Sequence, residues 1–88
     1  MCPGPLVIDA ELTDRPVPTT LGRRFGAEGF WPRWTRAECA AKLSGTPIAI
    51  WLRRHGLHVP ADFPGCFRSY QDGLVGHHLV VAVAWLHT

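Results

Sequence analysis

One stretch of the chain constrains the fold most, because helix start and stop signals meet in it: Trp34 to Gly56, WTRAECAAKLSGTPIAIWLRRHG. Thr35 and Glu38 have the spacing of a capping box, in which each side chain bonds the backbone N–H of the other residue. Ser44-Gly45 follows a run of good helix formers and predicts the helix end, since glycine tolerates positive φ. We therefore predict a first helix over 35–44.

A second helix follows almost at once. Thr46 can act as its N-cap, and Pro47 suits the first helical position, where a missing N–H costs nothing. Gly56 suits the stop, and three cationic side chains would complement the negative end of the helix dipole just before it. These are Arg53, Arg54 and His55. The sequence thus predicts a helix over 46–55 and, with the helix before it, a helix-turn-helix.

Before this stretch the chain alternates and then becomes irregular. Leu6–Leu12 alternates with period two, which predicts a strand. We expect the first set of alternate side chains to face a core and the second to face away; the sets are Leu6, Ile8, Ala10 and Leu12, and Val7, Asp9 and Glu11. Two prolines make 13–20 an extended connector, and glycines interrupt 21–32, where a short helical turn fits around Leu21–Phe25.

After Gly56 the prolines of 57–66 predict a loop. Asp72-Gly73 between apolar-rich arms then indicates a hairpin over 66–86, because Asp-Gly favours the type I′ turn that connects two antiparallel strands. The run Leu79–Leu86 is apolar on both faces, so a strand and a buried helix both fit it; its valines favour the strand.

Composition bounds the class of protein. With 88 residues, 47% of them hydrophobic and 18% charged, we predict one globular α+β domain over 1–88, a helix-turn-helix on a small antiparallel sheet. Neither a secretory signal nor an apolar run of about 18 residues is present, so we expect a cytoplasmic protein with no membrane partner. The three cysteines, which cannot all pair within one chain, fit a reducing compartment.

The stretch also resembles a known family of small DNA-binding domains. Thr35, Glu38 and Ala40 match the first helix of the MerR-type and excisionase-type winged helix-turn-helix, and Thr46-Pro47 with Ile50 matches its recognition helix. Gly56-Leu57 and Pro60 resemble the exit into the wing, and Phe67-Arg68-x-Tyr70 resembles the wing itself. The resemblance covers about 34–74 and predicts a winged-helix-like domain.

The resemblance implies a small non-enzymatic DNA-binding protein of the mobile-element or phage regulator or excisionase type. Its nucleic-acid-binding residues would be Arg36, Thr46, Arg53, Arg54 and Arg68. Its partner would be DNA or a larger protein or nucleoprotein complex, and a homodimer stays open.

The apolar second helix supports an alternative. Base-reading helices normally carry donors and acceptors, whereas an apolar helix packs inside a domain or docks on a protein. The alternative is a compact protein-binding inhibitor, for example an anti-CRISPR or another host-defence inhibitor, that uses the helix-turn-helix against a protein. Its binding residues would be Ile48, Trp51, Leu52 and Arg53.

Catalytic and metal chemistry has little support in the sequence. A Cys–His hydrolase would need Cys39 beside His77 or His78, but no orienting Asn or Asp stands out downstream. Zinc could draw on several scattered side chains, yet no C-x2-C pair exists. These side chains are Cys39, His55, His58, Cys66, His77 and His78. We expect no enzyme activity, no metal and no cofactor.

Overall fold

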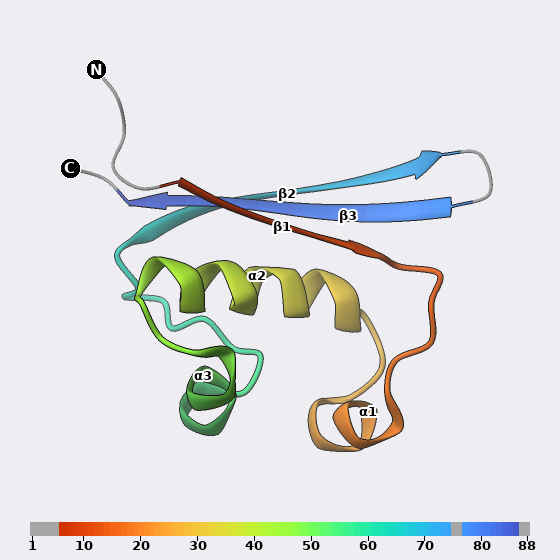
Figure 1. Ribbon diagram of the computed structural model, residues 1–88, viewed down its shortest axis with the longest axis horizontal. Helices are drawn as coiled ribbons and strands as arrows, with labels where there is room; N and C mark the ends of the chain where they lie inside the picture. The colour runs from red at the N-terminus through yellow and green to blue at the C-terminus, as the bar shows by residue number, and fades with distance from the viewer. Residues whose placement is uncertain (1–5, 75–76, 87–88) are drawn as a thin grey trace.

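The computed structural model describes residues 6–74 and 77–86, which form an α+β domain of two layers (Figure 1). The elements in chain order are β1 (Leu6–Leu12), α1 (Thr19–Phe25), α2 (Phe30–Leu43), α3 (Ile48–His55), β2 (Gly65–Leu74) and β3 (His77–Leu86). Helix α2 runs along one face of the sheet, and α1 and α3 lie beneath its two ends. The predicted α+β class is confirmed. None of the described helices has the length and apolar character needed to cross a bilayer.

The antiparallel sheet has the order β1-β3-β2, so the last strand of the chain is the central one. The run Leu79–Leu86 is therefore a strand, as its valines favoured. The turn prediction at Asp72-Gly73 is wrong: both residues lie within β2, and pairing continues to Leu74 opposite His77. Pairing with β3 continues one residue past the dipeptide, so pairing between strands overrides the local turn preference of Asp-Gly.

The start of α2 differs from the capping-box prediction. The helix begins at Phe30, after Gly29, whose φ of 59° lies in the left-handed region. Pro32 does not stop it, since the N–H groups of a first turn have no partner within the helix. Thr35 is therefore inside the helix, completely buried, and its hydroxyl donates to the Pro32 carbonyl at 3.0 Å. The tertiary packing of Phe30 extends the helix past the local signal.

The turn between the two predicted helices has the expected glycine. Gly45 adopts a φ of 66°, and Gly56 ends α3 with a φ of 63°. The N-cap prediction for Thr46 is wrong, because Pro47 takes that position and the Thr46 hydroxyl accepts a hydrogen bond from Ser44 instead, at 3.0 Å. The glycines end their helices for the predicted reason, whereas the cap moves by one residue.

The core forms where α2 meets the central strand. Helix α2 presents small side chains, and β3 presents equally small ones in alternate positions, all at most 2% exposed. These are Ala37, Cys39, Ala40 and Ala41 on the helix, and Val80, Ala82 and Ala84 on the strand. Aromatic side chains fill the space between the helices; Phe30, Trp31 and Trp51 are the buried ones. Small residues let helix and sheet approach closely, and aromatics supply most of the buried area.

The face prediction for β1 is wrong. Leu6, Ile8 and Leu12 are 55%, 55% and 39% exposed, whereas the alternate side chains point towards α2. The register explains the reversal, because Asp9 pairs with Ala82, and directly paired residues share one face of a sheet. Ala82 packs beneath α2, so Asp9 must lie on the same side. Alternation alone defines two faces but does not say which one a helix covers.

Asp9 consequently lies in a partly desolvated position between β1 and α2. Lys42 Nζ stands 3.5 Å from Asp9 Oδ1 and also donates to the Ile8 carbonyl at 3.2 Å. Burial raises the pKa of Asp9, and the Lys42 charge opposes that shift. The pKa of Glu38 is raised as well, first by burial and then by the Asp9 charge. The ionised form of Asp9 is thus less favourable in the folded state than in the unfolded one.

We expect Asp9→Asn to increase the free energy of unfolding at pH 7, because it removes a desolvated charge and keeps the side-chain shape. A raised carboxyl pKa means that the folded state binds the proton more tightly, so the wild type gains stability as the pH falls towards the usual value of 3.8. The advantage of the variant should therefore shrink between pH 7 and about pH 3.5. Urea unfolding of both proteins at the two pH values measures it; a variant less stable at pH 7 would contradict the assignment.

Candidate nucleic-acid interface

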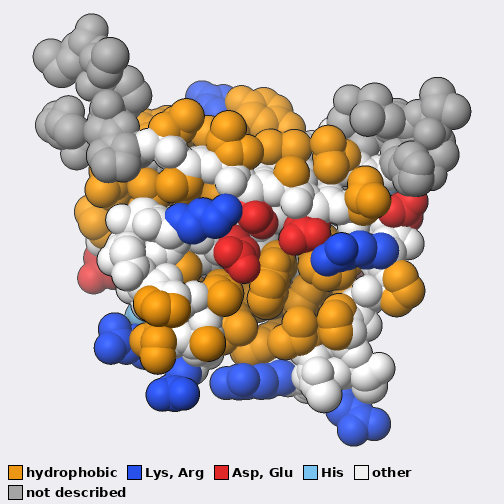
Figure 2. All heavy atoms as spheres, viewed as in Figure 1, with side chains coloured by type: hydrophobic (Ala, Val, Ile, Leu, Met, Phe, Trp, Pro, Cys, Tyr) orange, Lys and Arg blue, Asp and Glu red, His pale blue; other side chains and the backbone are white. Residues whose placement is uncertain are grey.

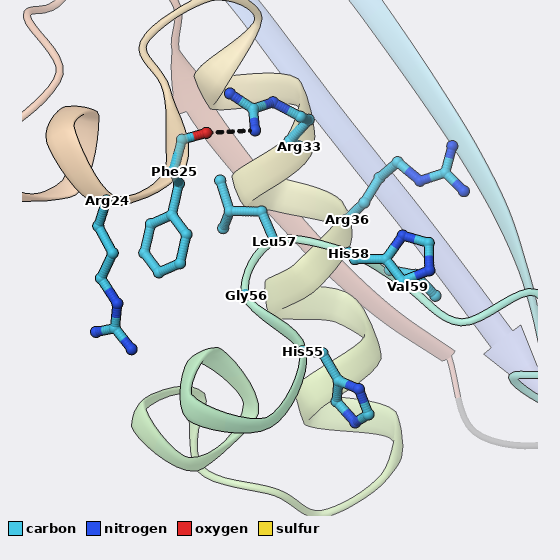
Figure 3. Close-up of a pocket in the computed structure, with 9 residues that line it drawn as sticks. All are labelled: Arg24, Phe25, Arg33, Arg36, His55, Gly56, Leu57, His58 and Val59. Carbon is cyan, nitrogen blue, oxygen red and sulfur yellow. Dashed lines mark hydrogen bonds between the residues drawn. The ribbon is translucent and has the colours of Figure 1, made fainter.

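The side of the molecule opposite the sheet contains an open cleft of about 610 Å³ between the helices. We call it the cationic cleft; it is lined by Arg24, Phe25, Arg33, Arg36, His55, Gly56, Leu57, His58 and Val59 (Figure 3). The lining contains three arginines, two histidines and no carboxylate. An anionic ligand would therefore meet attraction from several sides and no like-charge repulsion at the wall.

Arg33 builds one wall of the cleft. Its guanidinium donates to the carbonyls of Phe25, Gly26 and Glu28, each at 2.8 Å, and to that of Gly29 at 3.3 Å. Figure 3 shows the side chain directed towards Phe25, at the end of α1. Carbonyls at a helix end lack partners within the helix, so one side chain closes α1 and orders the loop that leads into α2. Arg33 is thus committed to the fold, and the other cations remain for a ligand.

The C-terminal ends of α1 and α3 meet at the cleft and carry the same short pattern. Arg23-Arg24-Phe25-Gly26 ends α1, and Arg53-Arg54-His55-Gly56 ends α3; both glycines have positive φ, 83° and 63°. A methyl group added to Gly56 would lie 3.4 Å from Phe25 Cε1, so the two ends are in close contact. Two arginine pairs from distant parts of the chain are thereby brought to the same side of the molecule.

These four arginines are all exposed. Each helix C-terminus carries about half a negative charge at most, so the two ends offset only a small part of four cations. Within the described part of the chain, neither Arg24 nor Arg54 forms an ion pair. Figure 2 shows Lys and Arg side chains along the edge formed by α1 and α3, whereas the carboxylates at the centre of this view lie nearer to the sheet. The two arginine pairs therefore lie along one edge of the domain (Figure 2), although the formal net charge of the chain is only +2.

Two arginines of the cleft lie over aromatic rings, and one of its histidines packs on another ring. The Arg24 guanidinium lies 5.0 Å from the centre of the Phe25 ring, and that of Arg36 lies 5.2 Å from the Phe67 ring. The His55 ring packs on Trp51 with 4.5 Å between ring centres. Aromatic faces attract cations and restrict their rotamers without neutralising the charge. Ordering these arginine side chains around a ligand would therefore cost less entropy than ordering freely rotating ones.

Of the five residues predicted to bind nucleic acid, Arg36 lines the cationic cleft. Arg53 and Arg54 lie at the adjoining end of α3, where Arg54 lines a neighbouring pocket together with Thr46 and Asp62. Thr46 is half-buried and bonded to Ser44. Arg68 lies elsewhere: it pairs with Val83 in a register that places both on the sheet face away from α2. The wing-like strand thus carries its arginine on the opposite side of the molecule.

The residues predicted for protein binding by α3 lie mostly against the core. Trp51 is only 3% exposed, and Ile48 and Leu52 pack on the same cluster. Arg53 is the one exposed member of that set. The apolar character of α3 therefore serves packing inside the domain.

Cys39 has the surroundings of a core thiol. It is fully buried, its Sγ donates to the Ala82 carbonyl at 3.4 Å, and burial raises its pKa to about 11. A nucleophilic cysteine needs the thiolate and access to substrate, and neither condition is met here. His78 is exposed, while the side chain of His77 lies outside the described residues. Among the described residues, no group of three or more His, Cys, Asp or Glu side chains is placed to hold a metal ion.

Sequence reasoning missed Arg23 and Arg24 as site residues. The signal was present, because the Arg-Arg-aromatic-Gly pattern that marks the end of α3 also occurs at positions 23–26. The glycine-rich surroundings of α1 concealed it, since they made a helix there difficult to predict.

Comparison with family models, with curated proteins and with solved structures found no match for this chain.

We expect Arg33→Met to lower the free energy of unfolding by about 1.5–3 kcal/mol, the range for hydrogen bonds that involve a charged group, with the lower end favoured by partial exposure. Arg36→Met is the matched control, since it removes an arginine from the same helix with no hydrogen bond described, and should cost less than about 0.5 kcal/mol. Urea unfolding of both variants measures the difference. Equal losses would show that the bonds to the end of α1 contribute nothing specific.

Proposed function

We propose that this protein is a small non-enzymatic DNA-binding protein that holds the phosphate backbone at the cationic cleft and at the arginine pairs beside it. The resemblance of its helix-turn-helix stretch to regulators and excisionases of phages and other mobile elements points to the same class. Arg24 and Arg54 hold phosphates from the two helix ends, and Arg36 reaches the cleft from α2.

The observation that carries the proposal is the meeting of two helix ends, each with an exposed arginine pair, beside a cleft whose lining has Arg24, Arg33 and Arg36 and no carboxylate. Phosphate contacts by Arg and Lys supply most of the affinity in nucleic-acid binding, and they require cations spread over a surface that a backbone can follow. Here the cations come from the ends of two helices and from the side of a third. A single small anion would need fewer.

The exposed surface of α3 also indicates how DNA is read. Besides Arg53 and Arg54, its exposed positions include Ala49 and, at the cap, Pro47, neither of which has a side-chain donor or acceptor. Specific readout in the major groove depends on such groups at the N-terminal part of a recognition helix. We infer that binding is dominated by phosphates and depends weakly on base sequence.

The experiment is a titration of a fluorescent duplex at several salt concentrations. For about four phosphate contacts the logarithm of the binding constant should fall with the logarithm of salt with a slope of about −3 to −4. Arg24→Ala and Arg54→Ala should each reduce the slope by about 1, and together they should weaken binding by at least about tenfold at low salt.

Arg68→Ala is the matched control, because it removes the same charge from the opposite face of the domain. It should leave the slope nearly unchanged. Absence of duplex binding at low salt would exclude the proposal, and an equal loss in Arg68→Ala would exclude the cationic cleft as its site.

A further inference from the structure

Most of the described side chains on the sheet face away from α2 are apolar, and no described element covers this face. We call it the outer face. Its side chains form cross-strand rows in the register of the sheet: Leu6, Trp85 and Cys66; Ile8, Val83 and Arg68; Ala10, Val81 and Tyr70; and Leu12 and Leu79. Leu79 pairs on its other side with Asp72, whose side chain lies outside the described residues. All three helices lie on the other side (Figure 1). Among the side chains described on the outer face, Arg68 is the one charge.

The exposure of this face is large for a protein that acts alone. Ile8 is 55% exposed and Tyr70 57%, on opposite edge strands, with half-buried Val81 and Val83 between them. With about 4.8 Å between strands and about 3.4 Å per residue, the rows span roughly 15 Å by 25 Å. Monomers rarely expose contiguous apolar patches larger than a few hundred Å², and larger ones mark interaction sites.

We propose that a second copy of this chain covers the outer face, so that two sheets stack into a sandwich with the helices of each copy on the outside. Two faces of roughly 400 Å² in projection, enlarged by the relief of their leucine, isoleucine and aromatic side chains, bury about 1,000 Å² in total, which is the lower bound for a specific interface. Sheets stacked face to face lie about 10 Å apart, with their side chains interdigitated.

The charge pattern favours a second copy over other occupants. A lipid surface is met by several Lys and Arg around an apolar face, and here there is only Arg68 among the described side chains. A different protein partner is usually selected by complementary charges or by repulsion of wrong partners. The described side chains of the outer face carry one charge, that of Arg68, so two copies of the face can meet with little repulsion between these side chains, which is the condition for an isologous two-fold interface.

The position of Arg68 also selects the direction of the two-fold axis. If the axis runs parallel to the strands, β3 stacks on β3 and β2 lies over β1 of the other copy. Each Arg68 then lies over the aliphatic edge strand, with its stem covering apolar surface and its charge at the rim. An axis across the strands would instead place β2 over β2 and bring the two Arg68 side chains together. We therefore assign the axis parallel to the strands.

The test is the molar mass in solution, measured by light scattering and sedimentation from about 1 µM to about 1 mM without DNA. The wild type should approach twice the chain mass of 9.8 kDa as its concentration rises. Ile8→Lys and Tyr70→Lys, one on each edge strand, should each require at least about tenfold higher concentration for the same dimer fraction, because they bury an unpaired charge.

Ala61→Lys adds the same charge at an exposed position between α3 and β2 and should leave the dimer unchanged. Ile8→Glu should weaken it less than Ile8→Lys, since the carboxylate can approach Arg68 of the other copy. Circular dichroism checks that each variant is folded. If Ile8→Lys does not fold, Ile8→Thr is used in its place, because threonine is also β-branched and suits a strand.

A monomeric wild type at the highest concentration overturns the proposal and assigns the outer face to another partner. A dimer that persists in both lysine variants overturns it as well. If Ile8→Glu proves as disruptive as Ile8→Lys, the assigned axis is wrong. None of these outcomes depends on DNA binding, so the dimer and the proposed function succeed or fail separately.

Discussion

Close packing of α2 on the central strand is the contact on which the rest of the structure depends. The helix contributes Ala37, Ala40 and Ala41 to it, and β3 contributes Ala82 and Ala84, each at most 2% exposed. Side chains this small bring the helix close to the sheet, and a larger one would separate the layers because interiors have little free volume. The contact joins the middle of the chain to its last strand, and β1 and β2 are attached to the sheet only through β3.

A single covered face of the sheet follows from this arrangement and explains where the charged groups lie. With β3 fixed by α2, the register turns Asp9 and Glu11 towards the helix, where Lys42 meets Asp9. The aliphatic side chains of β1 turn outward as a consequence. The described helices all lie on one face of the sheet (Figure 1), so the apolar side chains of the other face remain exposed among the described elements.

The two sides of the domain therefore differ in chemistry. On the helical side, the ends of α1 and α3 gather arginines around a cleft whose wall is held by Arg33. On the other side, the sheet presents rows of aliphatic and aromatic side chains with Arg68 among them. Protein cations bind a polyanion by releasing the counterions condensed on it, whereas apolar surface is stabilised by leaving water. The two sides are suited to different partners, and each can be tested without the other.

The sequence by itself determined the features that depend on neighbouring residues. Gly45 and Gly56 end helices through their own freedom at positive φ, the valines of Leu79–Leu86 favour a strand, and the cations before Gly56 mark the end of α3. Tertiary structure decided the rest, because it depends on pairing between distant segments. Register with β3 chose the buried face of β1, packing of Phe30 moved the start of α2, and the meeting of two helix ends gathered the arginines. Local sequence patterns predict the period of an element and its ends. They do not predict which face of a strand is buried, or which distant segment a side chain will contact.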